Sequence, residues 1–130
     1  MPEFGFATND IASVSIHDLG SVVILRLTGE IDLSTADAVD NALSSCLSLL
    51  SRAVIIDLTS VEFIGATGLN ILVRAHRAAL SRDIALRIVA DTPVVLRSIG
   101  VSGLDAHLPL SLSVTSALKD VRDDMNVNAG

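Results

Sequence analysis

The sequence has no tryptophan, no tyrosine and only three phenylalanines among its 130 residues. Proteins that bind single-stranded nucleic acids stack bases on aromatic side chains, so the composition offers no support for that class. Cationic residues are also in the minority, because nine Lys and Arg stand against fifteen Asp and Glu, which gives a formal net charge of −6. This balance argues against binding to nucleic acid phosphates and to anionic membrane surfaces.

Cysteine and long apolar runs are scarce as well. Cys46 is the only cysteine, which excludes an internal disulfide and is typical of a reducing compartment. The apolar runs Val22–Leu25 and Val54–Ile56 are far too short to cross a bilayer. The N-terminus lacks a basic segment followed by an apolar one, so the sequence does not predict a signal peptide. We therefore expect a soluble, cytoplasmic protein without membrane insertion.

Familiar catalytic and cofactor-binding patterns are missing too. The sequence contains no Gly-x-Ser-x-Gly elbow, no Walker A loop and no Gly-x-Gly-x-x-Gly. His17, His76 and His107 are isolated from one another and from Cys46, so a zinc site has no sequence support. Cys46 lies on the apolar side of a predicted helix and is expected to be a small core residue. The sequence thus predicts neither an enzyme nor a metal or cofactor site.

Half of the residues are hydrophobic, mostly Val, Ile, Leu and Ala, which suits a sheet packed by helices. One domain, residues 1–130, is the natural expectation for this length. We expect its ordered core at about residues 11–125, between a loose N-terminal segment and a frayed tail at residues 126–130.

Hydrophobic periodicity predicts an alternation of strands and helices. The predicted strands are residues 11–17, 22–28, 53–58, 84–90 and 108–110. The predicted helices follow Ser34, Gly68, Thr92 and either Ser111 or Ser113, and the third ends at Gly100. A short turn joins the first two strands as an antiparallel hairpin. The fold class is therefore α/β, with a mixed, mostly parallel sheet of about four to five strands, its first strand antiparallel, packed by about four helices.

Phe63–Asn70 is the most informative segment of the sequence. It lies between an apolar strand and an apolar helix, and its Gly65–Gly68 core is typical of a tight turn that opens onto a helix. Backbone amides exposed at such a helix start can hold a phosphate or a phosphorylated hydroxyl. Thr67 carries the only hydroxyl there. Local preferences favour Thr67 as a helix cap, and a phosphorylated switch is the alternative.

Glu30 and Asp32 form a second candidate segment, where the chain leaves the second predicted strand. Nothing nearby in the sequence supplies a nucleophile or a metal ligand, so an acid–base pair is not favoured. Two readings stay open: a solvated loop whose acids precede a helix, or a surface that meets a partner protein.

Three stretches of the sequence resemble the STAS-domain proteins of the anti-sigma factor antagonist family. They are Val23–Asp32 followed by Thr35-Ala36, Val54–Leu58 with Val61–Ile64 and Thr67–Leu69, and Ile99–Leu104. The resemblance covers nearly the whole chain and implies the STAS fold. It also implies a role. Such proteins bind a serine-kinase anti-sigma factor and so free a sigma factor for transcription; the kinase phosphorylates them, and a PP2C-type phosphatase reverses this.

The chain departs from the family at the phosphorylated position. The family typically has Asp-Ser-Ser/Thr-Gly where this sequence has Gly65-Ala66-Thr67-Gly68. Ala66 therefore stands where the phosphorylated Ser is expected, and Gly65 where the Asp is expected. Thr67 is a substitute acceptor one position on, but a helix turns by about 100° per residue, so its hydroxyl would point elsewhere. We expect a non-enzymatic binding module without the ordinary phosphorylation switch.

The resemblance also indicates which residues meet the partner. They are Glu30, Asp32, Ser34, Thr35, Gly65, Ala66, Thr67, Gly68, Leu69 and Asn70. The alternative functions are a small subunit of a lipid or anion transport complex and a nucleotide-binding sensor, because a glycine-flanked helix start can cradle a phosphate. No Lys or Arg lies within that loop, which opposes anion capture. A homodimer is compatible with the sequence.

Overall fold

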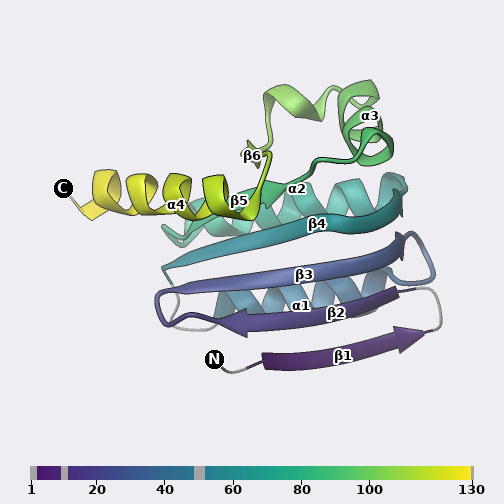
Figure 1. The fold of residues 1–130 in the computed structure, drawn as a ribbon, viewed down its shortest axis with the longest axis horizontal. Coiled ribbons are helices and arrows are strands. Elements are labelled where there is room, and N and C mark those ends of the chain that lie inside the picture. Colours follow the sequence, from purple (N-terminus) through teal and green to yellow (C-terminus); the bar gives the residue numbers. More distant parts are fainter. Residues whose placement is uncertain (1–2, 10–11, 49–51, 130) are drawn as a thin grey trace.

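The computed structural model describes residues 3–9, 12–48 and 52–129. Within these residues the chain forms one mixed sheet with helices on both faces (Figure 1). The strands are β1 (Glu3–Asn9), β2 (Ala12–Asp18), β3 (Val22–Ile31), β4 (Ala53–Ile64), β5 (Ala85–Val89) and β6 (Leu110–Ser111). The helices are α1 (Ala36–Ser48), α2 (Ala66–Ser81), α3 (Pro93–Val101) and α4 (Val114–Ala129), with a short 3₁₀ turn η1 (Leu104–Ala106).

The strands lie side by side in the order β1 to β6. The pairs β1–β2 and β2–β3 are antiparallel, and the pairs from β3 to β6 are parallel. This confirms the predicted mixed, mostly parallel α/β sheet. The prediction of a loose segment before residue 11 was wrong for residues 3–9, because they pair with β2 as β1. α4 continues to Ala129, into the segment for which the sequence predicts a frayed tail.

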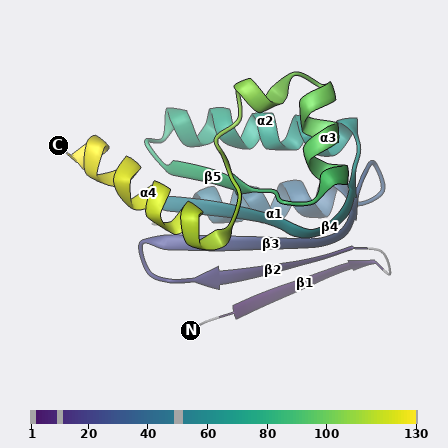
Figure 2. The ribbon, with the colours of Figure 1, turned by 45° about the horizontal axis from the view of Figure 1, so that its top comes forward.

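Successive side chains of β3 and β4 point to opposite faces of the sheet and build two cores. One face packs against α1, α2 and α3 and includes Leu25 and Ile56. The other face packs against α4, where Ile24 and Ile55 meet Val121. Figure 2 shows α4 in front of the sheet with α1 and α2 behind it. Burial on both faces explains why the central strands are almost continuously apolar.

Asp57 is the one carboxylate among the buried residues that the structure describes, and it lies on the α4 face of β4. Its Oδ2 accepts a hydrogen bond from Arg26 Nε at 3.0 Å. Its Oδ1 accepts the backbone N–H of Thr59 at 2.9 Å and the Thr59 hydroxyl at 2.7 Å. The buried charge is therefore paired and hydrogen-bonded, as a charge inside a sheet must be.

β4 is longer than predicted, because it continues past Leu58 to Ile64. Register shifts after Arg26 and after Gly29 each place one additional β4 residue opposite β3. Such β-bulges let a strand keep pairing while its direction changes. As a result, the start of the Phe63–Asn70 segment belongs to the sheet rather than to a turn.

The first helix is not capped by Ser34 as predicted. α1 begins at Ala36, and the carbonyl of Thr35, directly before it, accepts the N–H of Val39 at 3.2 Å. The Ser34 hydroxyl instead donates to Asp32 Oδ1 at 2.7 Å. A local side-chain bond of this kind competes with capping.

The residues that precede α3 and α4 agree with the sequence predictions. Thr92 stands at the N-cap position of α3 with Pro93 following it, as predicted, but the Thr92 side chain makes no capping hydrogen bond. Ser113, rather than Ser111, precedes α4, and its hydroxyl accepts the N–H of Ser116 at 3.0 Å. Gly100 does not end α3, which continues to Val101. Among the described helices, none is long and apolar enough to cross a membrane.

Candidate functional site

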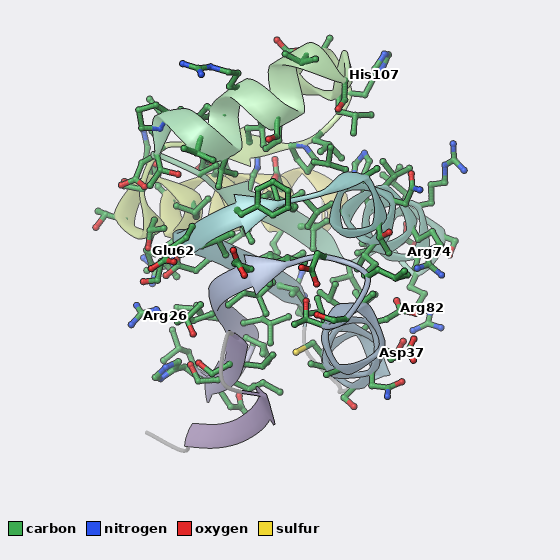
Figure 3. The ribbon with its side chains drawn as sticks, turned by 90° about the vertical axis from the view of Figure 1, so that its right-hand side faces the viewer. Arg26, Asp37, Glu62, Arg74, Arg82 and His107 are labelled. Atoms are coloured by element: carbon green, nitrogen blue, oxygen red, sulfur yellow. The ribbon has the colours of Figure 1, made fainter. Side chains whose placement is uncertain are left out.

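The two segments that the sequence singles out meet at the carboxyl ends of β3 and β4. Glu30 pairs with Phe63 along the sheet, and Ile31 pairs with Ile64. The N–H of Gly65 then donates to the carbonyl of Ile31 at 2.9 Å. Figure 3 looks onto this edge, with Glu62 on one side of the sheet and the labelled Asp37 of α1 and Arg74 of α2 on the other.

The loop after β3 is held by its own side chains. Asp32 Oδ1 accepts the N–H of Ser34 at 2.9 Å. The Thr35 hydroxyl donates to the carbonyl of Glu30 at 3.0 Å and accepts the N–H of Asp32 at the same distance. Thr35 is buried, so it shapes the loop and offers no surface. Glu30 and Asp32 stay partly exposed, and Leu33 at the tip is 81% exposed. Leu33 was missed by the sequence reasoning, which weighed only the polar residues here.

The start of α2 differs from the predicted cap. Gly65 is the N-cap, with extended backbone at φ −90° and ψ −178°, and it makes no side-chain hydrogen bond. The predicted cap, Thr67, is the second residue of the helix and only partly exposed, so that prediction was wrong. Ala66 is the first residue of α2, and its methyl group faces solvent.

At Gly68, α2 lies in close contact with the sheet. A Cβ atom at this position would lie 2.7 Å from Ile64 Cγ1 and 2.9 Å from Ile31 Cγ2. Both isoleucines are buried, so neighbouring atoms restrict their movement. Only glycine therefore lets α2 start at this distance from β3 and β4. Gly68 and the buried Leu69 position the site, whereas Ala66 and Asn70 face outward.

An open groove of about 400 Å³ runs beside the start of α2. Its lining residues come from the end of β4, from α2 and from α3: Phe63, Ile64, Ala66, Leu69, Arg97, Ser98, Val101 and Ser102. Two apolar side chains on its walls are open to solvent, since Phe63 is 45% and Val101 84% exposed. The contribution of α3 was missed from sequence. The Ile99–Leu104 match touches this helix end, but nothing in it indicates that α3 lies beside α2.

Residues 13–117 match the family described as the STAS domain. The chain is also 35% identical over 113 residues to the anti-sigma-F factor antagonist RsfB of Mycobacterium tuberculosis (strain ATCC 25618 / H37Rv), covering 87% of this chain and 92% of RsfB. This chain belongs to the STAS-domain family of anti-sigma factor antagonists.

Solved structures agree with the assignment of this STAS domain. It is similar to the crystal structure of an anti-sigma factor antagonist from Mycobacterium paratuberculosis, with a TM-score of 0.81 and 32% identity over 90% of this chain and 99% of that one. The unphosphorylated form of the anti-sigma factor antagonist SpoIIAA shares the fold, with a TM-score of 0.71 and 17% identity over 85% and 96% of the two chains.

In this STAS domain the aromatic ring of Phe63 lies against Gly65. A Cβ atom at Gly65 would be 3.4 Å from Phe63 Cε2, so a longer side chain would have to share the space with the ring. The turn between β4 and α2 therefore presents an apolar surface, made by Phe63 and Ala66, with no charged side chain in it.

The described residues outside this edge offer few reactive or metal-binding groups. Cys46 is fully buried, and this burial raises the pKa of its thiol to about 11, so it remains a protonated core residue, as predicted. Over residues 3–9, 12–48 and 52–129, no group of three or more His, Cys, Asp or Glu is arranged to hold a metal ion.

Proposed function

We propose that this STAS domain binds a serine-kinase anti-sigma factor and thereby takes part in a partner-switching pathway that controls sigma-factor-dependent transcription. The docking surface consists of Glu30, Asp32, Leu33, Phe63 and Ala66. The observation that carries the proposal is the meeting of these residues at one edge, where exposed large apolar side chains stand beside carboxylates. Exposed apolar side chains with a polar rim are typical of protein interfaces. The names of the relatives at 35% and 32% identity support the same role.

We further propose that the complex is not switched by phosphorylation at position 66. Ala66 stands where the family motif has the phosphorylated Ser. It is exposed at the first position of α2, so a hydroxyl there would be open to a kinase. A methyl group has no oxygen that could accept a phosphoryl group. The domain would then act like an antagonist that is always unphosphorylated.

Thr67 is the remaining candidate for phosphorylation. It is only partly exposed, and its place one residue further along α2 rotates it by about 100° from Ala66. A PP2C-type phosphatase is a partner of this domain only if Thr67 is phosphorylated. We therefore treat Thr67 as a secondary site whose use the experiments below decide.

Binding is tested by isothermal titration of the domain with its cognate anti-sigma factor. We expect a dissociation constant of about 1 μM or lower for the wild type. Leu33→Ser should weaken binding about ten-fold, because it removes an exposed apolar anchor from the docking surface. Leu80→Ser is the matched control, since Leu80 is also exposed but lies in the last turn of α2, about 20 Å along the helix from Ala66. Lack of binding by the wild type would refute the proposed function.

Phosphate mapping tests the missing switch. After incubation with the kinase and Mg-ATP, we expect Ala66→Ser to take up phosphate at residue 66 and to bind the kinase more weakly, while the wild type stays unmodified. Mass spectrometry of both proteins, with Thr67→Ala as the control, assigns the site. Stoichiometric phosphate on Thr67 of the wild type would contradict the proposal that phosphorylation no longer controls the domain.

A further inference from the structure

Among the described residues, Arg97 is the one charged side chain that lines the groove beside the start of α2. It projects from α3 and is exposed. Within the described part of the chain, Arg97 takes part in no ion pair and no side-chain hydrogen bond. Its guanidinium therefore lines a mostly apolar groove with its N–H donors available to a partner.

The other polar groups of the groove are already engaged. The Ser98 hydroxyl donates to the carbonyl of Val94 at 3.2 Å, and the Ser102 hydroxyl donates to the carbonyl of Ser98 at 2.8 Å. Both bonds stay within α3 and its C-cap. Arg97 is thus the group that can give the groove polar specificity.

We propose that the groove receives an apolar side chain of the anti-sigma factor and that Arg97 binds a carboxylate next to that side chain. Phe63 and Val101 supply the apolar walls, and their exposure leaves room for a partner group. A planar guanidinium matches the two oxygens of a carboxylate, and the bond strengthens where apolar walls exclude water. This inference rests on the proposed function and specifies what the partner must present.

The charges around the docking surface also predict the orientation of the partner. The acidic residue Glu30 lies at the end of β3 and Asp32 follows that strand, whereas the cation of Arg97 belongs to α3. A partner that places a carboxylate at Arg97 cannot be reversed without bringing that carboxylate to the acidic segment. Juxtaposed like charges disfavour such wrong orientations.

Charge reversal at Arg97 tests the inference against the same anti-sigma factor. We expect Arg97→Glu to weaken binding at least about ten-fold at low salt and Arg97→Ala to weaken it less. Arg97→Lys should fall between Arg97→Ala and the wild type, because it keeps the charge and loses the planar two-point match. Arg122→Glu is the matched control, because it changes the net charge equally at an exposed position on α4. Circular dichroism verifies that the variants are folded.

The possible results separate the two proposals. If the wild type binds and Arg97→Glu behaves like Arg122→Glu, Arg97 meets no carboxylate and this inference is wrong. If Arg97→Glu weakens binding while Arg97→Ala does not, the effect is repulsion alone, which also overturns it. If the wild type itself does not bind, the proposed function fails first.

Discussion

Replacing Arg26 by Met is expected to lower the free energy of unfolding by about 3–5 kcal/mol, which is the usual effect of leaving a buried charge without its partner. Asp57 has no exposed side-chain surface, and Arg26 Nε is its cationic donor at 3.0 Å. After the substitution only the two bonds from Thr59 would remain to stabilise the carboxylate. Urea denaturation followed by circular dichroism measures the change.

Removal of the other partner should be less harmful. The Arg26 side chain is 46% exposed, so in Asp57→Ala the guanidinium can be hydrated, and we expect a loss of about 1–3 kcal/mol from the unpaired Thr59 groups. The double variant should lose less free energy of unfolding than the two single variants together. Both charged groups are then removed, so no charge is left without its partner. A larger loss for Asp57→Ala than for Arg26→Met would contradict this reasoning.

Arg74 and Asp40 provide the control pair. Their closest charged atoms are 3.6 Å apart, and the side chains on α2 and α1 are 61% and 43% exposed. Because exposed ion pairs contribute little, Arg74→Met should change the free energy of unfolding by about 1 kcal/mol or less. Burial of the carboxylate, rather than the number of charges removed, is therefore expected to determine the size of the effect.

Gly68→Ala is expected to destabilise the domain by about 1–3 kcal/mol through overpacking. The added Cβ would lie 2.7 Å from Ile64 Cγ1, 2.9 Å from Ile31 Cγ2 and 3.2 Å from the carbonyl oxygen of Ile31. These atoms are near the backbone of buried residues, so relief requires that α2 moves away from the sheet. The higher helix propensity of alanine offsets only part of the loss. Because α2 carries Ala66, binding of the partner should weaken as well.

Gly100→Ala is the matched substitution for Gly68→Ala. Gly100 is also inside a helix, α3, but a Cβ there would meet no atom within 4 Å. We expect this variant to be about 0.4–1 kcal/mol more stable than the wild type, because alanine restricts the unfolded chain. Thermal and urea denaturation of both variants should give opposite signs. Equal changes in the free energy of unfolding would mean that the close contact with Ile31 and Ile64 is not the reason why position 68 requires glycine.

The elements that could be predicted from sequence are those whose stability is mainly local or whose burial leaves a clear pattern. The apolar run at 53–58 predicts an interior strand because both of its faces are covered. The parallel arrangement then predicts that Glu30 and the start of α2 lie at the same edge, and the pairing of Glu30 with Phe63 confirms it. Thr92 and Pro93 at the start of α3 follow from helix-start preferences alone.

Other elements depend on contacts between distant residues, which a local pattern does not record. β1 has a mixed sequence and exists through its pairing with β2. The end of β4 includes exposed polar residues such as Ser60 and Glu62, and it stays a strand because β3 pairs with it through two register shifts. The N-cap at Gly65 arises in the same way, since its N–H is held by Ile31 of the neighbouring strand.

The candidate site divides along the same line. Its two segments could be singled out from the sequence, because each is contiguous and matches a family motif, but the start of α2 at Ala66 and the burial of Thr35 could not. Phe63 and Val101 could not be assigned to one groove, because they are far apart in sequence and meet only where α3 packs near the end of β4. The most exposed apolar residues of the site therefore emerge only from the fold.

The exposed methyl group of Ala66 has a consequence for how quickly the proposed complex could respond. A covalent switch reverses on the timescale of an enzyme reaction and leaves the amount of protein unchanged. Without it, occupancy of the anti-sigma factor follows mass action, so it depends on the abundance of this domain relative to its competitors. Under the proposed function, the cell would adjust the pathway through synthesis and degradation of the antagonist, and the response would be graded and slow.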